Sequence, residues 1–313
     1  MLSNLYGKID AKVGRIETGI PGMPNGETGS TALLTGCDGY FEANEIIVNN
    51  VGHALSPRSG IMHFKVNKII VNNNHPTYQV ANISQIPGQA TIGTTSTIEF
   101  DEVYNNRGKN QGTCAVIHQI GTLNLKGRKM VNEIDATISS GANSNIQIDY
   151  MENTGNWVTL QLGGDFPYKS YVKNTTSKVA IARAVLLNYD KIAGVTTKSI
   201  TFDNCTFRTE SSGNDYIMQV INYGVSGFTP VAMNVNLKGI NTFNYIPNNL
   251  ITFVDSGSIY VDGQPLLFGK YIYLVGNETT DGSWRMKATL SGDMIIEARI
   301  SGSWVNKQTL TLI

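Results

Sequence analysis

Pairs of carboxylates are the first residues to test for chemistry, because cleaving a glycosidic bond needs two of them facing one groove. The nearest pairs in sequence are Asp149 with Glu152, Asp101 with Glu102, and Glu210 with Asp215. If coils of about 23 residues stack, Asp101 and Asp149 share a face two coils apart. Turn carboxylates that only meet solvent are nevertheless the commoner case. The sequence therefore predicts no catalytic residue and favours a role that is not enzymatic.

Histidines and cysteines do not form a recognisable metal site. The four histidines, at 53, 63, 75 and 118, lie in one half of the chain without ligand spacing, and no Cys-x-x-Cys pair occurs. Cys37, Cys114 and Cys205 are far apart and are expected to be buried free thiols, with Cys205 at an inward position. Motifs for nucleophilic catalysis or phosphate binding are missing. We predict neither a metal nor a cofactor.

Aromatic side chains are better candidates for binding, because sugars stack on aromatic faces while Asn and Asp supply hydrogen bonds. One cluster falls in the irregular stretch 150–190, and a second, weaker one is Tyr216, Tyr223 and Phe228. The first cluster comprises Trp157, Asp165, Phe166, Tyr168 and Tyr171. Burial beneath a loop is the alternative for these aromatics. They are the predicted ligand-binding residues.

These residues lie on a chain of repeated short β-type segments, each closed by Asn, Asp or Gly. Glu45–Asn50 (EIIVNN) and Lys68–Asn73 (KIIVNN) are the clearest copies. The first inward apolar residues are at 46, 69, 98, 123, 146, 200, 233 and 259. The long interval from 146 to 200 fits two coils of 27, with Val179–Ile181 as the intervening segment. A spacing of about 20–30 residues is typical of a solenoid.

The fold class predicted is therefore all-β, a right-handed parallel β-helix over residues 40–268. Asn is about a tenth of the chain, and stacked corner asparagines that hydrogen-bond along the axis explain this excess. A β-sandwich is the alternative, but its strands recur every 8–12 residues in hairpins with Asn-Gly or Asp-Gly turns. Such turns lie only at the edges of this region.

The two ends differ from the middle. In residues 1–39, Leu5, Ile9, Val13, Ile16 and Ile20 recur at helical spacing, so we predict a short helix followed by a Pro/Gly loop. Residues 269–313 alternate as an antiparallel meander with one apolar face. Such a small sheet is marginal alone, so it is expected to pack against other copies. The contact residues predicted are Trp284, Met286, Ile295 and Trp304.

Charge and hydropathy narrow the partners. Lys plus Arg and Asp plus Glu are 24 each, and charged residues make up only 15% of the chain. A neutral surface gives no electrostatic reason to bind nucleic acid or an anionic membrane. The absence of an apolar export signal in residues 1–20 and of any 18-residue apolar run predicts assembly in a cytoplasm without membrane insertion.

This domain plan resembles the tail spikes and tail fibres of tailed bacteriophages. At residue level the likeness is confined to the C-terminal part, Thr280–Met286, Met294–Glu297 and Gly302–Val305. The resemblance implies a homotrimer in the virion: an N-terminal segment for attachment to other virion proteins, a β-helical shaft and a C-terminal trimerisation cap. It also implies contact with a host cell-surface polysaccharide.

Four functions follow from these observations. The first is a phage structural protein that binds a host glycan. A polysaccharide depolymerase, hydrolase or lyase, on the same fold is an alternative, because a fold does not fix a function. A head fibre or decoration protein without a receptor role is another. A cell-surface adhesin or secreted β-helix is disfavoured by the missing export signal.

Overall fold

The structure, a computed structural model, describes an all-β chain. The described residues are 2–4, 8–18, 33–35, 38–49, 53–73, 83–85, 93–107, 114–118, 120–133, 136–155, 158–163, 169–179, 185–188, 197–209, 218–221, 232–239, 241–244, 251–253, 257–261, 264–266, 272–275, 280–288 and 294–310. They form two compact units, residues 1–257 and 258–313, so the division precedes the predicted boundary at 268.

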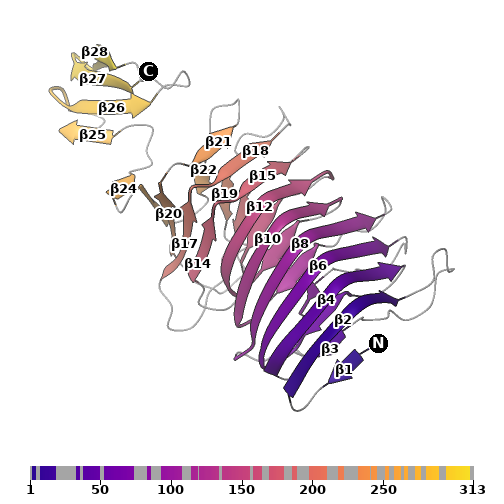
Figure 1. The fold of residues 1–313 in the computed structure, drawn as a ribbon. Helices are drawn as coiled ribbons and strands as arrows, with labels where there is room; N and C mark the ends of the chain where they lie inside the picture. Colours follow the sequence, from indigo (N-terminus) through magenta and orange to yellow (C-terminus); the bar gives the residue numbers. More distant parts are fainter. Residues whose placement is uncertain are drawn as a thin grey trace. The chain divides into compact units, whose positions relative to one another are not determined.

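The first unit consists of successive coils, each of which contributes one short strand and one long strand. The short strands pair in the order β1 (Leu2–Asn4), β3 (Leu33–Thr35), β5 (Leu55–Pro57), β7 (Ile83–Ser84), β9 (Val116–His118), β11 (Ile138–Ser140), β13 (Leu160–Leu162), β16 (Val185–Asn188), β19 (Met218–Ile221) and β22 (Ile251–Phe253). The long strands β2 (Lys8–Thr18), β4 (Asp38–Asn49), β6 (Ile61–Asn73), β8 (Thr95–Arg107), β10 (Thr122–Asn132) and β12 (Asn143–Asn153) lie side by side in the same way (Figure 1).

All recorded pairings between these strands are parallel. Parallel neighbours need a crossover from each strand to the next, which a coil provides. The predicted parallel β-helix is thus confirmed as a parallel β-solenoid. The sandwich alternative is excluded for this region, because its hairpins would pair antiparallel.

The helix predicted near the N-terminus is wrong, because Lys8–Thr18 forms β2, the first long strand of the sheet. Ile9, Ala11 and Val13 alternate as inward residues of a strand. The strand then bends at Gly14, which places Ile16 inward after a step of three instead of two. The apparent helical spacing therefore comes from a bent strand.

Each early long strand bends at one position that the ladder of pairs skips. We call these residues the bend column: Gly14, Asn44, Asn67, Asp101, Arg128 and Asp149. In later coils the long strand is divided in two at this point. The halves are β14 (Lys169–Lys173) and β15 (Thr176–Val179), β17 (Thr197–Asp203) and β18 (Thr206–Thr209), and β20 (Ala232–Lys238) and β21 (Thr242–Asn244).

The residues that divide the late strands have a left-handed backbone. Asn174, Asn204 and Gly239 have φ values of 47°, 54° and 65°, and Asn and Gly tolerate this region best. We refer to the coils of β2–β12 as the early coils and those of β14–β21 as the late coils.

Inward side chains stack into columns on both sides of the bend. Before it, the column runs through Phe41, Phe64, Ile98, Leu125, Ile146, Val172 and Phe202. After it, the column is Ile46, Ile69, Val103, Met130, Met151, Ser177 and Phe207. All of these are at most 2% exposed, so the interior is a continuous core.

This register corrects the predicted one. Ile98 stacks on Phe64 and not on Ile69, and Leu123 stacks on Ser96. Each long strand carries two apolar runs, one on each side of the bend. The repeated segments predicted from sequence mix the two runs, since Ile69 follows the bend and Ile98 precedes it. The intervening coil between 146 and 200 exists as predicted, but its core residue is Val172.

Asparagines stack at the end of the long strands. Asn72 Nδ2 donates to Asn49 Oδ1 at 3.2 Å and Asn106 Nδ2 donates to Asn72 Oδ1 at 3.1 Å. In the next coils the buried Asn105 Nδ2 donates to Asn132 Oδ1 at 2.6 Å. The predicted hydrogen bonding of corner asparagines along the axis is confirmed for these pairs.

The recorded pairings from residue 258 onward are antiparallel. β23 (Gly257–Val261) begins at the last residue of the first unit and pairs with β24 (Gln264–Leu266). A separate sheet has the order β25 (Ile272–Val275), β26 (Trp284–Ala288), β27 (Met294–Ile300) and β28 (Ser303–Leu310). The predicted C-terminal meander is confirmed as a fold.

Candidate functional site

The outer surface of the long sheet is built from columns of outward side chains, because parallel strands in register place equivalent residues one above another. One of them, which we call the neutral column, contains Tyr40, His63, Thr97, Asn124, Asn145, Tyr171, Thr201 and Asn236. Asn145 Nδ2 donates to Asn124 Oδ1 at 2.7 Å, and Asn124 Nδ2 donates to Thr97 Oγ1 at 3.2 Å. The column is therefore a continuous strip of amide, hydroxyl and aromatic groups along the axis.

Two further outward columns alternate in charge from coil to coil. The first charged column is Lys12, Glu42, Lys65, Glu99 and Lys126. The second charged column is Arg15, Glu45, Lys68, Glu102 and Lys129. Each charge has opposite charges on the neighbouring strands, which is the favourable arrangement for cross-strand pairs. Basic and acidic side chains therefore alternate regularly from strand to strand in the early coils.

Between the charged columns lies the bend column, where Arg128 binds two carboxylates. Its guanidinium contacts Asp101 through Nε to Oδ1 at 2.6 Å and through Nη2 to Oδ2 at 3.0 Å. Nη2 also lies 2.5 Å from Glu102 Oε1. The hydrogen bonds from Arg128 lower the pKa of Asp101, and the same carboxylates raise the pKa of Arg128.

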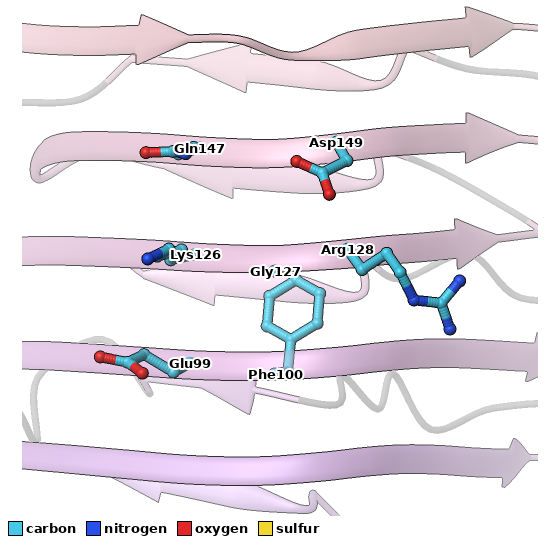
Figure 2. Close-up of a pocket in the computed structure, with 7 residues that line it drawn as sticks. All are labelled: Glu99, Phe100, Lys126, Gly127, Arg128, Gln147 and Asp149. Atoms are coloured by element: carbon cyan, nitrogen blue, oxygen red, sulfur yellow. The ribbon is translucent and has the colours of Figure 1, made fainter.

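A hollow of about 240 Å³ opens on this face over β8, β10 and β12. It is lined by Glu99, Phe100, Lys126, Gly127, Arg128, Gln147 and Asp149. Figure 2 shows Glu99, Lys126 and Gln147 along one side, and Arg128 and Asp149 along the other. The hollow therefore lies between two rows of polar groups.

Gly127 shapes the hollow through its lack of a side chain. A Cβ at this position would lie 2.2 Å from the Phe100 ring, so the ring fills the space that any other residue would need. Phe100 itself is 7% exposed. The hollow thus combines a glycine and an aromatic ring between its polar rows.

Asp149 is the carboxylate in the hollow that is available to a ligand. It is exposed, and within the described part of the chain no hydrogen bond or ion pair holds it. By contrast, Asp101 is held by Arg128. With a carboxylate, the Gln147 amide and the Lys126 ammonium, the hollow can both accept and donate hydrogen bonds.

The carboxylate pairs predicted from sequence are placed differently. Asp101 and Asp149 do share the bend column two coils apart, roughly 9.6 Å by strand spacing, with Arg128 between them. Glu152 lies in a different outward column, beside Val131 and Lys178. It accepts a hydrogen bond from the Tyr150 hydroxyl at 3.2 Å and pairs with Lys178 at 3.6 Å. Glu210 and Asp215 lie outside the described residues.

Among the predicted binding residues, Tyr171 is described and lies in the neutral column. Its hydroxyl donates to the Asp203 carboxylate, and this hydrogen bond raises the pKa of Tyr171 and lowers that of Asp203. Lys238 Nζ lies 3.4 Å from the same carboxylate. Trp157, Asp165, Phe166 and Tyr168 lie outside the described residues, as do Tyr216, Tyr223 and Phe228.

Sequence reasoning missed six of the residues that line the hollow: Glu99, Phe100, Lys126, Gly127, Arg128 and Gln147. The only signal was the spacing of 27 residues from Asp101 to Arg128 and of 21 residues from Arg128 to Asp149. That spacing is informative only once the coil register is known.

The four predicted contact residues of the C-terminal sheet do not share one face. Trp284 pairs with Ala298, whereas Trp304 pairs with Arg299, the next residue of β27. Because successive strand residues alternate in direction, the two tryptophans lie on opposite faces, and Ile295 lies on the Trp304 side. Met286 pairs with Ile296, and its side chain lies outside the described part.

The exposed apolar residues of this sheet gather on the Trp284 face. Trp284 is 40% exposed, and Ile300 and Val305 are 45% and 40% exposed. Val305 pairs with Ala298, directly beside Trp284. Ile300 and Val305 therefore belong to the apolar face that the sequence assigned to other residues.

The titratable side chains of His118 and Cys205 lie in the interior, away from the outer surface. His118 is fully buried with Nε2 3.1 Å from Ser96 Oγ, and burial lowers its pKa to about 4. Cys205 is buried as predicted, and burial raises its pKa to about 11. Cys114 is also a buried free thiol, whereas Cys37 lies outside the described residues.

Within the described residues, no three His, Cys, Asp or Glu side chains form a group that could hold a metal ion. The same residues include no helix long and apolar enough to cross a membrane.

Comparison with known proteins found no matching family model, curated protein or solved structure.

Proposed function

We propose that this chain is a structural protein of a bacteriophage virion, a tail spike or tail fibre that binds a host cell-surface glycan. The virion assignment rests on the resemblance of the domain plan. The binding assignment rests on one observation, the hollow between Lys126, Gln147 and Asp149 beside the neutral column. Glycans are bound by hydrogen-bonding side chains together with apolar surfaces.

The solenoid supports this proposal because it repeats the same groups along its axis. The neutral column presents Asn124, Asn145 and Tyr171 on three successive coils. A linear polymer lying along the axis meets hydroxyl and amide groups at each strand spacing, about 4.8 Å. Several weak contacts to one polymer then combine through their high effective concentration.

A polysaccharide depolymerase is the alternative that the shared face of Asp101 and Asp149 would favour. Such an enzyme needs one carboxyl group that stays protonated as the general acid. Arg128 lowers the pKa of Asp101, so Asp101 could act only as the ionised base or nucleophile. Both of its oxygens already accept hydrogen bonds from Arg128, which opposes that role and favours binding over cleavage in the hollow.

The proposal includes a homotrimer and attachment to other virion proteins through the N-terminal end. For the trimer, the Trp284 face of the C-terminal sheet is the surface we assign, because three exposed apolar side chains gather there. Solution mass measured by light scattering tests this. We expect a trimer for the native chain and dissociation for Val305→Asp, with Thr309→Asp as the control, because Thr309 pairs with Ile295 on the opposite face. A native monomer at micromolar concentration contradicts the trimer.

Binding is tested with the purified chain on a panel of capsular and O-antigen polysaccharides. We expect at least one polysaccharide to bind, and Asp149→Ala and Gln147→Ala to weaken it about tenfold, a loss of roughly 1.4 kcal/mol. Asn67→Ala is the matched control, because Asn67 lies in the bend column outside the hollow.

The outcomes separate the candidates. Retained binding in both hollow variants contradicts the assigned site, and shortening of the polysaccharide during incubation contradicts the non-enzymatic function. Absence of binding across the panel leaves the virion assignment without a receptor role and favours a head fibre or decoration protein.

A further inference from the structure

Within the described part of the chain, the long sheet ends at β2, which has one open edge. Among the described strands, β2 pairs with β4 along one edge and with no strand along the other. An unpaired edge presents backbone N–H and C=O groups that can pair with another chain. At 11 residues, β2 is long for an edge strand, since short edges are one of the ways proteins avoid such pairing.

The interior is also uncovered at this end. Ala11, Val13 and Ile16 are half-buried in the first coil. Their neighbours on β4, Phe41, Ala43 and Ile46, are at most 1% exposed. Solenoids need a terminal unit with a polar outer face, whereas β2 presents core residues. A further strand stacked on β2 would bury them as β4 is buried.

Charge indicates what that strand carries. The first and second charged columns both end at β2 with a basic residue, Lys12 and Arg15. Their side chains are 74% and 57% exposed. On the inner side each meets a glutamate: Lys12 Nζ lies 2.9 Å from Glu42 Oε1, and Arg15 Nε lies 3.4 Å from Glu45 Oε2. If the charges continue to alternate, a strand added to the open edge of β2 carries two acidic residues, three positions apart in its sequence.

We propose that the free edge of β2 is a docking site for a β-strand of a partner protein. The strand adds in parallel, with acidic residues opposite Lys12 and Arg15 and apolar residues opposite Ala11, Val13 and Ile16. Recognition is then β-augmentation, in which main-chain hydrogen bonds supply affinity and side chains supply specificity. This inference stands independently of what the outer hollow binds.

A second copy of this chain is a poorer occupant than such a partner. Two β2 strands related by a two-fold axis match their inward residues when Val13 faces Ile16 and Ala11 faces Thr18 of the other copy. In that register Lys12 faces Glu17, but Arg15 faces Gly14 and gains no acidic neighbour. A second copy therefore supplies only one of the two acidic residues that the edge calls for.

The chain itself supplies a probe with the required chemistry. β4, Asp38–Asn49, has glutamates opposite Lys12 and Arg15, so a synthetic peptide of its sequence, DGYFEANEIIVN, fits the pattern. The control peptide carries Glu42→Lys and Glu45→Lys and is otherwise identical. Binding to the full-length chain is measured by fluorescence anisotropy at low ionic strength, and hydrogen exchange locates the bound peptide.

We expect the acidic peptide to bind about tenfold more tightly than the lysine peptide, and its binding to weaken as salt rises. Hydrogen exchange in Lys8–Thr18 should slow when it binds. The variant Lys12→Gln/Arg15→Gln should remove the preference for the acidic peptide. The control variant Lys68→Gln/Lys129→Gln, which changes the second charged column at β6 and β10, should retain it.

Three outcomes overturn the proposal. They are equal binding of the two peptides, slowed exchange outside β2 only, and no binding of the acidic peptide up to roughly 1 mM, the concentration that corresponds to about −4.1 kcal/mol. Because both peptides are tested on the native chain, the result does not depend on whether the substituted chain folds.

Discussion

The early and late coils of the solenoid share one core but differ at the bend. In the early coils Asp101, Arg128 and Asp149 project outward from an undivided strand. In the late coils a left-handed Asn174 or Asn204 takes the outward place, and the next residue, Thr175 or Cys205, turns inward. A single change of backbone region at the corner therefore decides whether a side chain joins the outer face or the core.

The outer surface follows this difference. The second charged column continues from Lys129 into Tyr150, Thr176 and Thr206, so it loses its charge at β12, one coil before the strand divides. The hollow lies in the early coils, where charged residues occupy the bend. The backbone at the bend therefore decides which residue types can occupy it, since the left-handed corners of the late coils are taken by Asn174, Asn204 and Gly239.

The largest expected effect distinguishes the two regions by pH. His118 belongs to the early coils, whereas the late coils have Leu187 and Val220 in the same column. The folded-state pKa of His118 is lowered to about 4, below the unfolded value of about 6.5. The unfolded chain therefore binds the proton first, and stability falls as pH drops from 6.5 to 4.

This loss amounts to roughly 3 kcal/mol at pH 4 and below, at about 1.36 kcal/mol for each unit of pKa difference. Urea unfolding between pH 7 and pH 4 measures it. We expect His118→Gln to be less stable than the native chain at pH 7 and to lose less stability on acidification. Parallel pH curves for the two proteins contradict the assignment.

The next effect concerns the floor of the hollow. Gly127→Ala should cost about 1–3 kcal/mol, typical of overpacking, because the new Cβ meets the Phe100 ring. Gly14→Ala is the matched control in the bend column, since no atom lies within 4 Å of a Cβ there. We expect the control to change the free energy of unfolding by less than about 0.5 kcal/mol. Equal effects of the two substitutions rule out the described packing of Phe100.

A smaller effect tests the late corner. Asn204 has φ of 54°, and a left-handed residue other than Gly or Asn costs about 1–2 kcal/mol. Asn204→Ala should therefore destabilise by about 1 kcal/mol, while Asn204→Gly should cost less because glycine adopts this backbone freely. Asn67→Ala, at an early bend, should be nearly neutral. Thermal unfolding of the three variants measures the order, and a reversed order of the Asn204 variants contradicts the corner geometry.

The sequence predicts the strands of this protein better than it predicts their register. Repeated Ile-x-Val-Asn segments such as Ile46–Asn49 and Ile69–Asn72 report a strand and its closing corner, so the parallel coil was predictable. They do not report the register, because each long strand has two apolar runs and coil lengths vary. Ile69 to Val103 spans 34 residues, whereas Met130 to Met151 spans 21.

The site depends on that register, which explains why it was missed. Arg128 has no neighbour in sequence that marks it, and it meets Asp101 only when β10 lies on β8. The prediction of an N-terminal helix was wrong for a related reason, because the bend at Gly14 gives the apolar residues of a strand a spacing close to that of a helix. Alternating strand segments predicted the C-terminal sheet, but a face was misassigned because Trp304 pairs with Arg299.

The charged columns, the hollow and the open edge all depend on the register of the long strands. The structure places Lys65 beside Glu99, whereas stacking of Ile98 on Ile69, as the sequence repeat suggests, places Ile70 beside Glu99. Neighbouring parallel strands bring Cα atoms within the 4.4–6.8 Å range of a disulfide. Oxidation of Lys65→Cys/Glu99→Cys and of Ile70→Cys/Glu99→Cys, followed by peptide mapping, therefore decides between them. We predict a disulfide in the first variant and none in the second, and the opposite result would contradict the register.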